Sequence, residues 1–258
     1  MFKLSKKQKR WWEFLWAMTE KEIKARYKVA TLGFLWIILN PLLQMFAIGF
    51  IFQFFIPVRV NNYFLFLFSG LLLWNFFSYS VLKNVSMIVN ERMLIKKAKF
   101  PRESIIISIV LSNLFHTLIF FPIFMLIVFF FGELNFCWFF LSPFLLFFLT
   151  ILTIGFSLFF SALDVRFRDV SFAVSAIMPL WYYATPIVYS LNLLPKNIAN
   201  YFYLNPMTAI VEIFRFLVLG IPIYSWKLAI TSLIFTILIL FLGIFIFKKE
   251  EPYFDDWL

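Results

Sequence analysis

Residues 104–131 read SIIISIVLSNLFHTLIFFPIFMLIVFFF, a stretch of 28 residues that contains no Asp, Glu, Lys or Arg. Such a stretch exceeds the roughly 20 residues that an α-helix needs to cross the hydrocarbon core of a bilayer. A helix is the structure expected there, because it pairs backbone N–H and C=O groups within the segment itself. The stretch therefore predicts a membrane-spanning helix.

Five further segments have the same uncharged, apolar character. The chain has 258 residues, of which 63% are hydrophobic, and its mean hydropathy is +0.92, far from the composition of soluble proteins. We therefore expect an all-α integral membrane protein with six transmembrane helices. The other five predicted spans are approximately residues 33–56, 63–82, 139–163, 170–189 and 228–247.

The basic residues predict the orientation of these spans. Nineteen of the 23 Lys and Arg residues lie before the first span, in the second and fourth connections, or after the last span. Because cytoplasmic connections carry the excess of basic residues, both termini are expected in the cytoplasm. The net charge of +10 would suggest nucleic acid in a soluble protein, but this distribution indicates membrane orientation instead, so no nucleic-acid partner is expected.

The chain divides into a cytoplasmic N-terminus, residues 1–31, and a transmembrane domain, residues 32–258. Residues 11–29 form an amphipathic helix if wound at 100° per residue, and such a helix lies in the membrane interface. The alternative, a generic basic topogenic signal, would explain the charges but not the segregation of apolar residues onto one face of the helix. Glu22 and Arg26 interrupt that face and can pair at i, i+4 spacing. The face itself contains Trp11, Trp12, Phe14, Leu15, Trp16, Met18, Ile23 and Tyr27.

Residues 191–222 do not fit a further span. The run 207–220 is apolar but short, and Glu212 and Arg215 interrupt it at i, i+3 spacing, where they could pair. A seventh crossing would also place Lys248 and Lys249 outside, against the charge rule. We therefore expect two short re-entrant or interfacial helices on the outer side, separated near Asn205 and Pro206.

Several kinds of chemistry are excluded by the sequence. None of the seven glycines precedes a lysine, so the phosphate-binding loop of nucleotide hydrolases is absent. Cys137 is the only cysteine and His116 the only histidine, which leaves no metal-binding cluster. Proton- or sodium-coupled carriers place ionisable residues within their spans, and these spans have no Asp, Glu, Lys or Arg and a single histidine. We expect a chain that is not an enzyme, binds no cofactor and takes its energy from elsewhere.

Two cytoplasmic connections have unusual compositions. Residues 90–103, NERMLIKKAKFPRE, place lysines before Phe100 and Pro101, and proline stops a helix. A short helix with an aromatic tip suits a groove on another protein, whereas a simple positive-inside loop explains only the lysines. Residues 164–169, DVRFRD, hold four charges in six positions. They could form a membrane-edge stop or a partner contact.

The fifth predicted span contains Pro179 and Pro186 together with a group of aromatic residues. Trp and Tyr combine a stacking face with a hydrogen-bonding tip, which suits the C–H faces of sugars. An aromatic belt at the outer interface is the alternative for Tyr183 and Tyr189. Trp181 lies nearer the middle of the predicted span, where that alternative is weaker.

In chain order, these residues resemble the permease subunits of polysaccharide ABC exporters, whose members move lipid-linked O-antigen or teichoic acid. The first part of the resemblance is Arg26-Tyr27-Lys28, Leu32-Gly33, Trp36 and Asn40-Pro41-Leu42. The second is the segment 94–103 with Phe100-Pro101-Arg102-Glu103. The third is Arg168-Asp169-Val170, Trp181, Thr185-Pro186, Tyr189, Leu204-Asn205-Pro206-Met207, Glu212 and Phe214-Arg215. Ala30 departs from the pattern, which has a small hydroxyl residue there.

The resemblance implies an exporter subunit of the bacterial inner membrane that moves lipid-linked, O-antigen-like polysaccharide. It implies a homodimer that binds two ATP-binding cassette subunits, with ATP and Mg²⁺ held by those partners. The alternatives are an ABC exporter of a small hydrophobic compound or drug, and an energy-independent channel or lipid scramblase.

The resemblance also implies roles for individual residues. Those expected to contact the ATPase are Arg26, Lys28, Lys96, Lys97, Lys99, Phe100, Pro101, Arg102, Arg166, Arg168 and Asp169, within a coupling segment 90–103 and its neighbours. Those expected along the channel are Trp36, Phe46, Phe50, Trp181, Tyr182, Tyr183 and Tyr189. Those expected in an outer gate formed by residues 191–222 are Asn205, Pro206, Glu212 and Arg215.

Overall fold

The computed structural model describes residues 6–27, 35–55, 62–97, 100–131 and 134–257. Over these ranges the regular structure is entirely helical, which confirms the all-α prediction. The α-helices are α1 (Lys6–Tyr27), α2 (Leu35–Phe55), α3 (Tyr63–Val85), α4 (Met87–Asn90), α5 (Arg92–Lys97), α6 (Glu103–Phe130), α7 (Ser142–Arg166), α8 (Val170–Tyr183), α9 (Lys196–Phe202), α10 (Pro206–Leu219), α11 (Trp226–Glu250) and α12 (Phe254–Trp257). Short 3-10 helices are η1 (Phe139–Leu141), η2 (Leu191–Leu193) and η3 (Glu251–Tyr253).

Four helices of the described chain are long and apolar enough to cross a membrane. They are α3, α6, α7 with its preceding 3-10 turn, and α11 with the turn that follows it. Helices α2 and α8 are apolar but shorter, with apolar portions of Leu39–Phe52 and Val170–Tyr183. Four of the predicted spans are thus confirmed, and the chain is a multi-pass membrane protein.

The predicted helix over 170–189 is wrong beyond Tyr183, where α8 ends after 14 residues. Pro186 has no backbone N–H and cannot continue the helical hydrogen bonds, so the chain leaves the helix just before it. The side-chain amide of Asn205 donates to the Ala184 carbonyl at 3.3 Å and to Thr185 Oγ1 at 2.8 Å. The end of α8 is therefore stabilised by Asn205, the residue that precedes α10.

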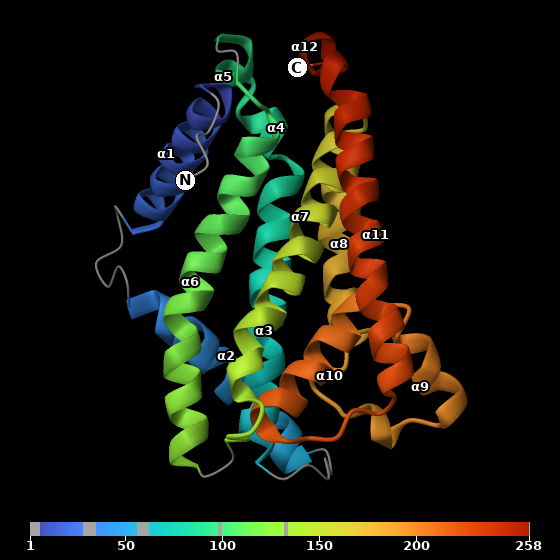
Figure 1. Cartoon of the computed structure of the whole chain (residues 1–258). Helices are drawn as coiled ribbons and strands as arrows, with labels where there is room; N and C mark the ends of the chain where they lie inside the picture. Colours follow the sequence, from blue (N-terminus) through green and yellow to red (C-terminus); the bar gives the residue numbers. More distant parts are fainter. Residues whose placement is uncertain (1–5, 28–34, 56–61, 98–99, 132–133, 258) are drawn as a thin grey trace.

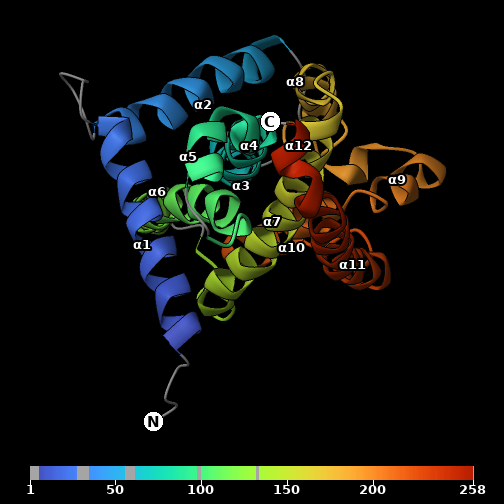
Figure 2. The ribbon, with the colours of Figure 1, turned by 90° about the horizontal axis from the view of Figure 1, so that it is seen from above.

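Helix α3 forms the centre of the bundle. It packs against α2, α6, α7, α8 and α10, and Figure 2 shows it surrounded by these neighbours. Leu67, Phe68, Leu71 and Leu73 are fully buried although they point in different directions around the helix. A helix that is apolar on all sides is expected to be buried, and this position satisfies that expectation.

Helices α7 and α11 run side by side and approach each other closely at two glycines (Figure 1). A Cβ atom added to Gly155 would lie 2.9 Å from the backbone of Leu240, and one added to Gly243 would overlap the Gly155 carbonyl. Small residues allow the backbones of membrane helices to approach in this way. The pairing of α7 with α11 therefore depends on the absence of side chains at these positions.

The two ends of the bundle differ in composition and structure. Figure 1 shows α5 and α12 at one end and α9 at the other. At the α9 end, α9 and α10 meet at an angle of 101°, with Asn205 capping α10 by accepting the Met207 N–H at 3.1 Å. This arrangement confirms the two short helices that were predicted to separate near Asn205 and Pro206.

Candidate functional site

Helix α1 confirms the predicted N-terminal helix as far as Tyr27, and it packs along α6. Leu15 and Met18 are buried, whereas Trp12 and Trp16 are 52% and 67% exposed. The predicted apolar face is therefore divided. One part contacts the bundle, and the part with Trp12 and Trp16 remains on the surface, where indole rings suit the lipid headgroup region.

Two ion pairs attach α1 to neighbouring elements. The buried carboxylate of Glu22 contacts Lys83 at the end of α3, and Lys21 Nζ lies 2.9 Å from Glu91 Oε1. Glu22 binds Lys83; the side chain of Arg26, the residue with which Glu22 was predicted to pair, and the whole of Lys28 lie outside the described residues. A buried carboxylate needs such a partner, because desolvation of an unpaired charge is costly.

The described residues of the predicted coupling segment, 90–97 and 100–103, contain the end of α4, helix α5 and the turn that begins α6. The Phe100 ring stacks on Phe14 of α1 with 4.5 Å between ring centroids. Lys96 and Lys97 are exposed at the end of α5, and Pro101 precedes the first turn of α6; Lys99 lies outside the described residues. The aromatic tip thus joins this segment to α1 and leaves its lysines available to a partner.

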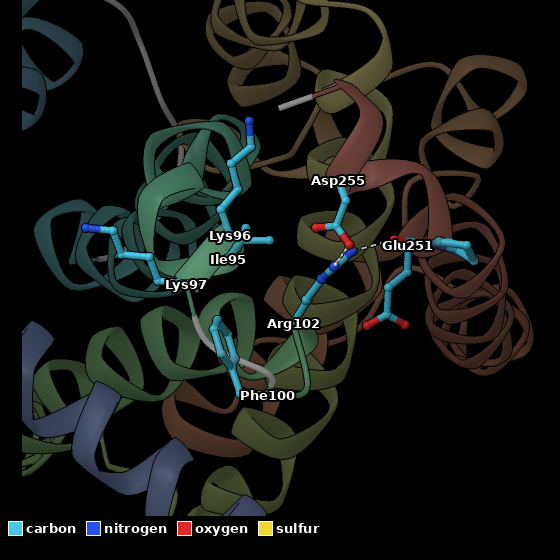
Figure 3. A pocket seen from close by; sticks show the side chains of 8 residues that line it. Ile95, Lys96, Lys97, Phe100, Arg102, Glu251 and Asp255 are labelled. Atoms are coloured by element: carbon cyan, nitrogen blue, oxygen red, sulfur yellow. Dashed lines mark hydrogen bonds and ion pairs between the residues drawn. The ribbon is translucent and has the colours of Figure 1, made fainter.

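A pocket of about 790 Å³ opens between this segment and the C-terminal end of the chain (Figure 3). Arg102 extends across it, donating to the Glu251 carbonyl and to Asp255 Oδ2, each at 2.6 Å. In Figure 3 the side chains of Lys96 and Lys97 extend away from Arg102. The pocket therefore has exposed ammonium groups on one side and a paired guanidinium on the other.

The connection 164–169 also contacts the C-terminal end. Arg166 lies 5.4 Å above the Trp257 ring and 3.9 Å from Glu250, and Arg168 donates to the Trp257 carbonyl at 3.2 Å. Buried Asp164 accepts the Ser171 N–H at 2.9 Å, while Asp169 is exposed just before α8. The two arginines therefore make local contacts, although both remain exposed enough to meet a partner.

The C-terminal residues were missed as functional candidates by the sequence analysis. Their acidic and aromatic side chains alternate in EEPYFDDW, directly after the basic end of α11. This alternation of acidic and aromatic residues, in a chain whose connections are basic, was the sequence signal that could have identified the C-terminal residues as candidates. Phe254 is fully buried in a small apolar cluster that also includes Met18, Ile95 and Ile106.

At the opposite end, the predicted pairing of Glu212 with Arg215 is corrected. The Arg215 guanidinium is buried and donates to four oxygens, which are Ser69 Oγ at 3.2 Å and the carbonyls of Phe66, Pro186 and Ile187 at 3.1, 2.5 and 2.7 Å. Glu212 instead accepts the hydroxyl of Tyr203. Arg215 therefore fastens the irregular segment after α8 to α3.

The predicted channel residues occupy different environments. The Trp181 ring packs edge-on against Phe77 and Phe156 within the bundle, at 5.2 and 4.9 Å between centroids. Tyr182 contacts Trp74 and Tyr183, and the Tyr189 hydroxyl donates to the Tyr183 carbonyl at 2.6 Å.

Three of the predicted channel residues have large exposed surfaces. Phe46, Phe50 and Tyr183 are 57%, 56% and 61% exposed. The side chain of Trp36 lies outside the described residues. The channel role of the whole set stays a prediction, and the exposed members are those able to contact a transported molecule or a second chain.

The sequence compares closely with one family of transporters. Residues 13–219 match the ABC-2 type transporters, a stretch that includes most of α1, residues 90–103, and helices α9 and α10. The chain belongs to the ABC-2 type transporter family. It is a permease, and permeases of this type work with an ATP-binding subunit.

Individual relatives extend this similarity over most of the chain. This permease is 33% identical to "O-antigen export system permease protein RfbA" of Klebsiella pneumoniae over 250 residues, 95% of each chain. It is 31% identical over 201 residues, 77% of each chain, to a protein of the same name from Myxococcus xanthus. It is 27% identical over 245 residues to "Polysialic acid transport protein KpsM" of Escherichia coli, covering 91% and 92% of the two chains.

Proposed function

We propose that this permease is the channel-forming subunit of an ATP-driven exporter of lipid-linked, O-antigen-like polysaccharide. The observation that carries this proposal is the similarity to the O-antigen export permease of Klebsiella pneumoniae over 95% of both chains. The relative from Escherichia coli that is named for polysialic acid transport supports the same substrate class.

The proposed assembly contains two copies of this chain and two ATP-binding subunits in a bacterial inner membrane. Lys96, Lys97, Arg166 and Arg168 are exposed at the end of the bundle that contains α5 and α12, which supports a cytoplasmic position for that end. In this arrangement α2 and α8 complete six spans, and both termini are cytoplasmic. The exposed rings on α2 and α8 support contact with the second copy along these helices.

The coupling segment provides a route for force in this assembly. A partner that displaces Phe100 would act on α1 through the stacked Phe14 ring and on α6 through the chain itself. Both helices pack against each other, and α6 also contacts the central helix α3. Movement produced by ATP binding would thereby reach the bundle that surrounds the proposed channel.

Loss of the aromatic tip is expected to separate ATP hydrolysis from transport. Phe100→Ala removes the stack on Phe14, an interaction worth about 0.5–1.5 kcal/mol, too little to unfold the chain. We expect the complex to assemble and hydrolyse ATP while exporting several-fold less polysaccharide. Adding Lys97→Glu to the same chain should lower export further. Phe130→Ala, at an 81% exposed position at the other end of α6, is the matched control. Unchanged export in Phe100→Ala cells would contradict the coupling role.

Deletion of the gene tests the proposed substrate. Loss of surface polysaccharide with unchanged drug tolerance, restored by the gene, is the expected result. Loss of drug tolerance with normal surface polysaccharide would instead identify a small hydrophobic substrate. Polysaccharide movement by the purified chain alone, without an ATP-binding subunit, would contradict an ATP-driven mechanism and indicate a channel or scramblase.

A further inference from the structure

The C-terminal segment, residues 250–257, contacts both cytoplasmic connections of the bundle. We call this segment the strap; it comprises the last residue of α11, the 3-10 turn η3 and α12. It contacts Arg102, Arg166 and Arg168 through hydrogen bonds, an ion pair and a cation–π contact. Its buried residue Phe254 lies in the apolar cluster at the same end.

Arg102 connects the strap to the coupling segment. The guanidinium donates to the Glu251 carbonyl and to the Asp255 carboxylate at 2.6 Å each, and Figure 3 shows it directed at both. Arginine can hold two acceptors at once because its donors form a rigid planar fork. Arg102 lies two residues after Phe100 and directly before α6, so the position of Phe100 is linked to the strap.

A second contact joins the beginning of α6 to the end of α11. Lys248 Nζ lies 3.0 Å from Glu103 Oε2 and 3.0 Å from Glu251 Oε2. Isolated exposed ion pairs contribute little, but this lysine bridges two carboxylates directly beside the Arg102 contacts. The start of α6 is therefore held to α11 by adjacent contacts that share residues.

The other end of the strap holds the connection between α7 and α8. Trp257 lies beneath the Arg166 guanidinium, and its carbonyl accepts a hydrogen bond from Arg168. Phe254, between the two sets of polar contacts, is fully buried and packs edge-on against Phe247 of α11 at 5.4 Å. A buried aromatic residue anchors the strap, and the arginines fix its two sides.

We propose that the strap joins the two cytoplasmic connections into one rigid coupling unit, with Arg102 as the positioning residue. Force applied at Phe100 would then reach α7, α8 and α11 as well as α6. This inference rests on the proposed function, because it assumes that an ATP-binding partner pushes on the coupling segment. It assigns the C-terminal residues a part in coupling that α6 alone would not require.

A charge exchange tests the proposal in the complete complex with the ATP-binding subunit. Arg102→Glu is expected to reduce the polysaccharide exported per ATP hydrolysed by about fivefold, since two charge-assisted hydrogen bonds become a repulsion. Asp255→Arg is expected to act in the same direction. The double variant should recover part of the loss, because the ion pair between positions 102 and 255 is restored with its charges reversed while the hydrogen bond to the Glu251 carbonyl is not. Lys249→Glu, an equal charge change at an exposed neighbouring position, is the matched control.

Two outcomes of this charge exchange would contradict the proposed role of the strap. Normal export per ATP in Arg102→Glu would show that the contact does not transmit force. Failure of Arg102→Glu to retain the ATP-binding subunit would place Arg102 in the partner interface instead. Recovery in the double variant cannot arise from a general loss of folding, so it reports specifically on the pair.

A crosslink distinguishes failure of the strap from failure of the proposed function. Cysteines at positions 102 and 255, in a chain with Cys137→Ser, are joined by a short bifunctional thiol reagent. A rigid unit predicts efficient crosslinking and, because the two cysteines have replaced the Arg102–Asp255 contact, a several-fold gain of export per ATP over the same protein without the reagent. Arrest of export by the crosslink would show that the strap must open, which contradicts the proposal. Absence of ATP-driven polysaccharide export in the wild-type complex would refute the proposed function, whereas crosslinking yield would still measure the strap contact.

Discussion

Arg215→Met is expected to cause the largest loss of stability among single substitutions in this permease. The side chain is buried, and its guanidinium satisfies a hydroxyl and three carbonyl oxygens from α3 and the segment after α8. Removing the guanidinium leaves these buried oxygens without hydrogen-bond donors, which lowers the free energy of unfolding by roughly 3–5 kcal/mol. We expect a sharply lower yield from membranes and a lower unfolding temperature in detergent.

Two further variants separate the effect of hydrogen-bonding geometry from that of charge. Arg215→Lys keeps the charge but loses the planar fork, so an intermediate loss of thermal stability is expected. Lys227→Met removes an exposed cation in the first turn of α11 and serves as the control, with little change expected. An Arg215→Met protein as stable as the wild type would show that these carbonyls are satisfied in another way.

Gly243→Leu is expected to separate α11 from α7. In an ordinary helix, replacing glycine by a better helix former stabilises by about 1 kcal/mol. Here the new side chain would meet the carbonyl of Gly155, a backbone atom that cannot move alone. Overpacking of this kind costs about 1–3 kcal/mol or more, so the sign of the usual effect is reversed.

The measurement for this prediction is the unfolding midpoint in detergent. Gly155→Leu should lower it similarly, because its added side chain would meet the backbone of Leu240. Thr231→Leu adds a side chain at an exposed position of α11 and should leave the midpoint nearly unchanged. Equal midpoints for Gly243→Leu and Thr231→Leu would mean that α7 and α11 do not approach each other at these glycines.

Helices α9 and α10 show which features local sequence signals predict and which they do not. Asn205 and Pro206 are a strong helix-start signal, and the structure places the cap of α10 there. The i, i+3 spacing of Glu212 and Arg215 correctly indicated two adjacent polar groups in an apolar helix. Their partners lie elsewhere in the chain, because Arg215 reaches carbonyls of Phe66 and Ile187 and Glu212 binds Tyr203.

The aromatic residues of α8 illustrate the same distinction. Their composition predicts that these rings can stack, but it does not tell which surface a ring faces. Trp181 faces Phe77 of α3 and Phe156 of α7, whereas Tyr183 is largely exposed two residues later. Neighbouring helices decide between these environments, and nothing in residues 170–189 alone specifies those neighbours.

The sequence by itself determined the helical membrane class, the positions of four long spans, and the basic character of one end. These features follow from each segment separately, because hydrocarbon requires uncharged helices that satisfy their own backbone groups. Only the tertiary structure decided that α3 is central, that Gly155 and Gly243 meet, and that Arg102 binds the C-terminal residues. All three depend on helices that pack together, and the last two join groups 88 and 153 residues apart, so no local pattern of residues records them.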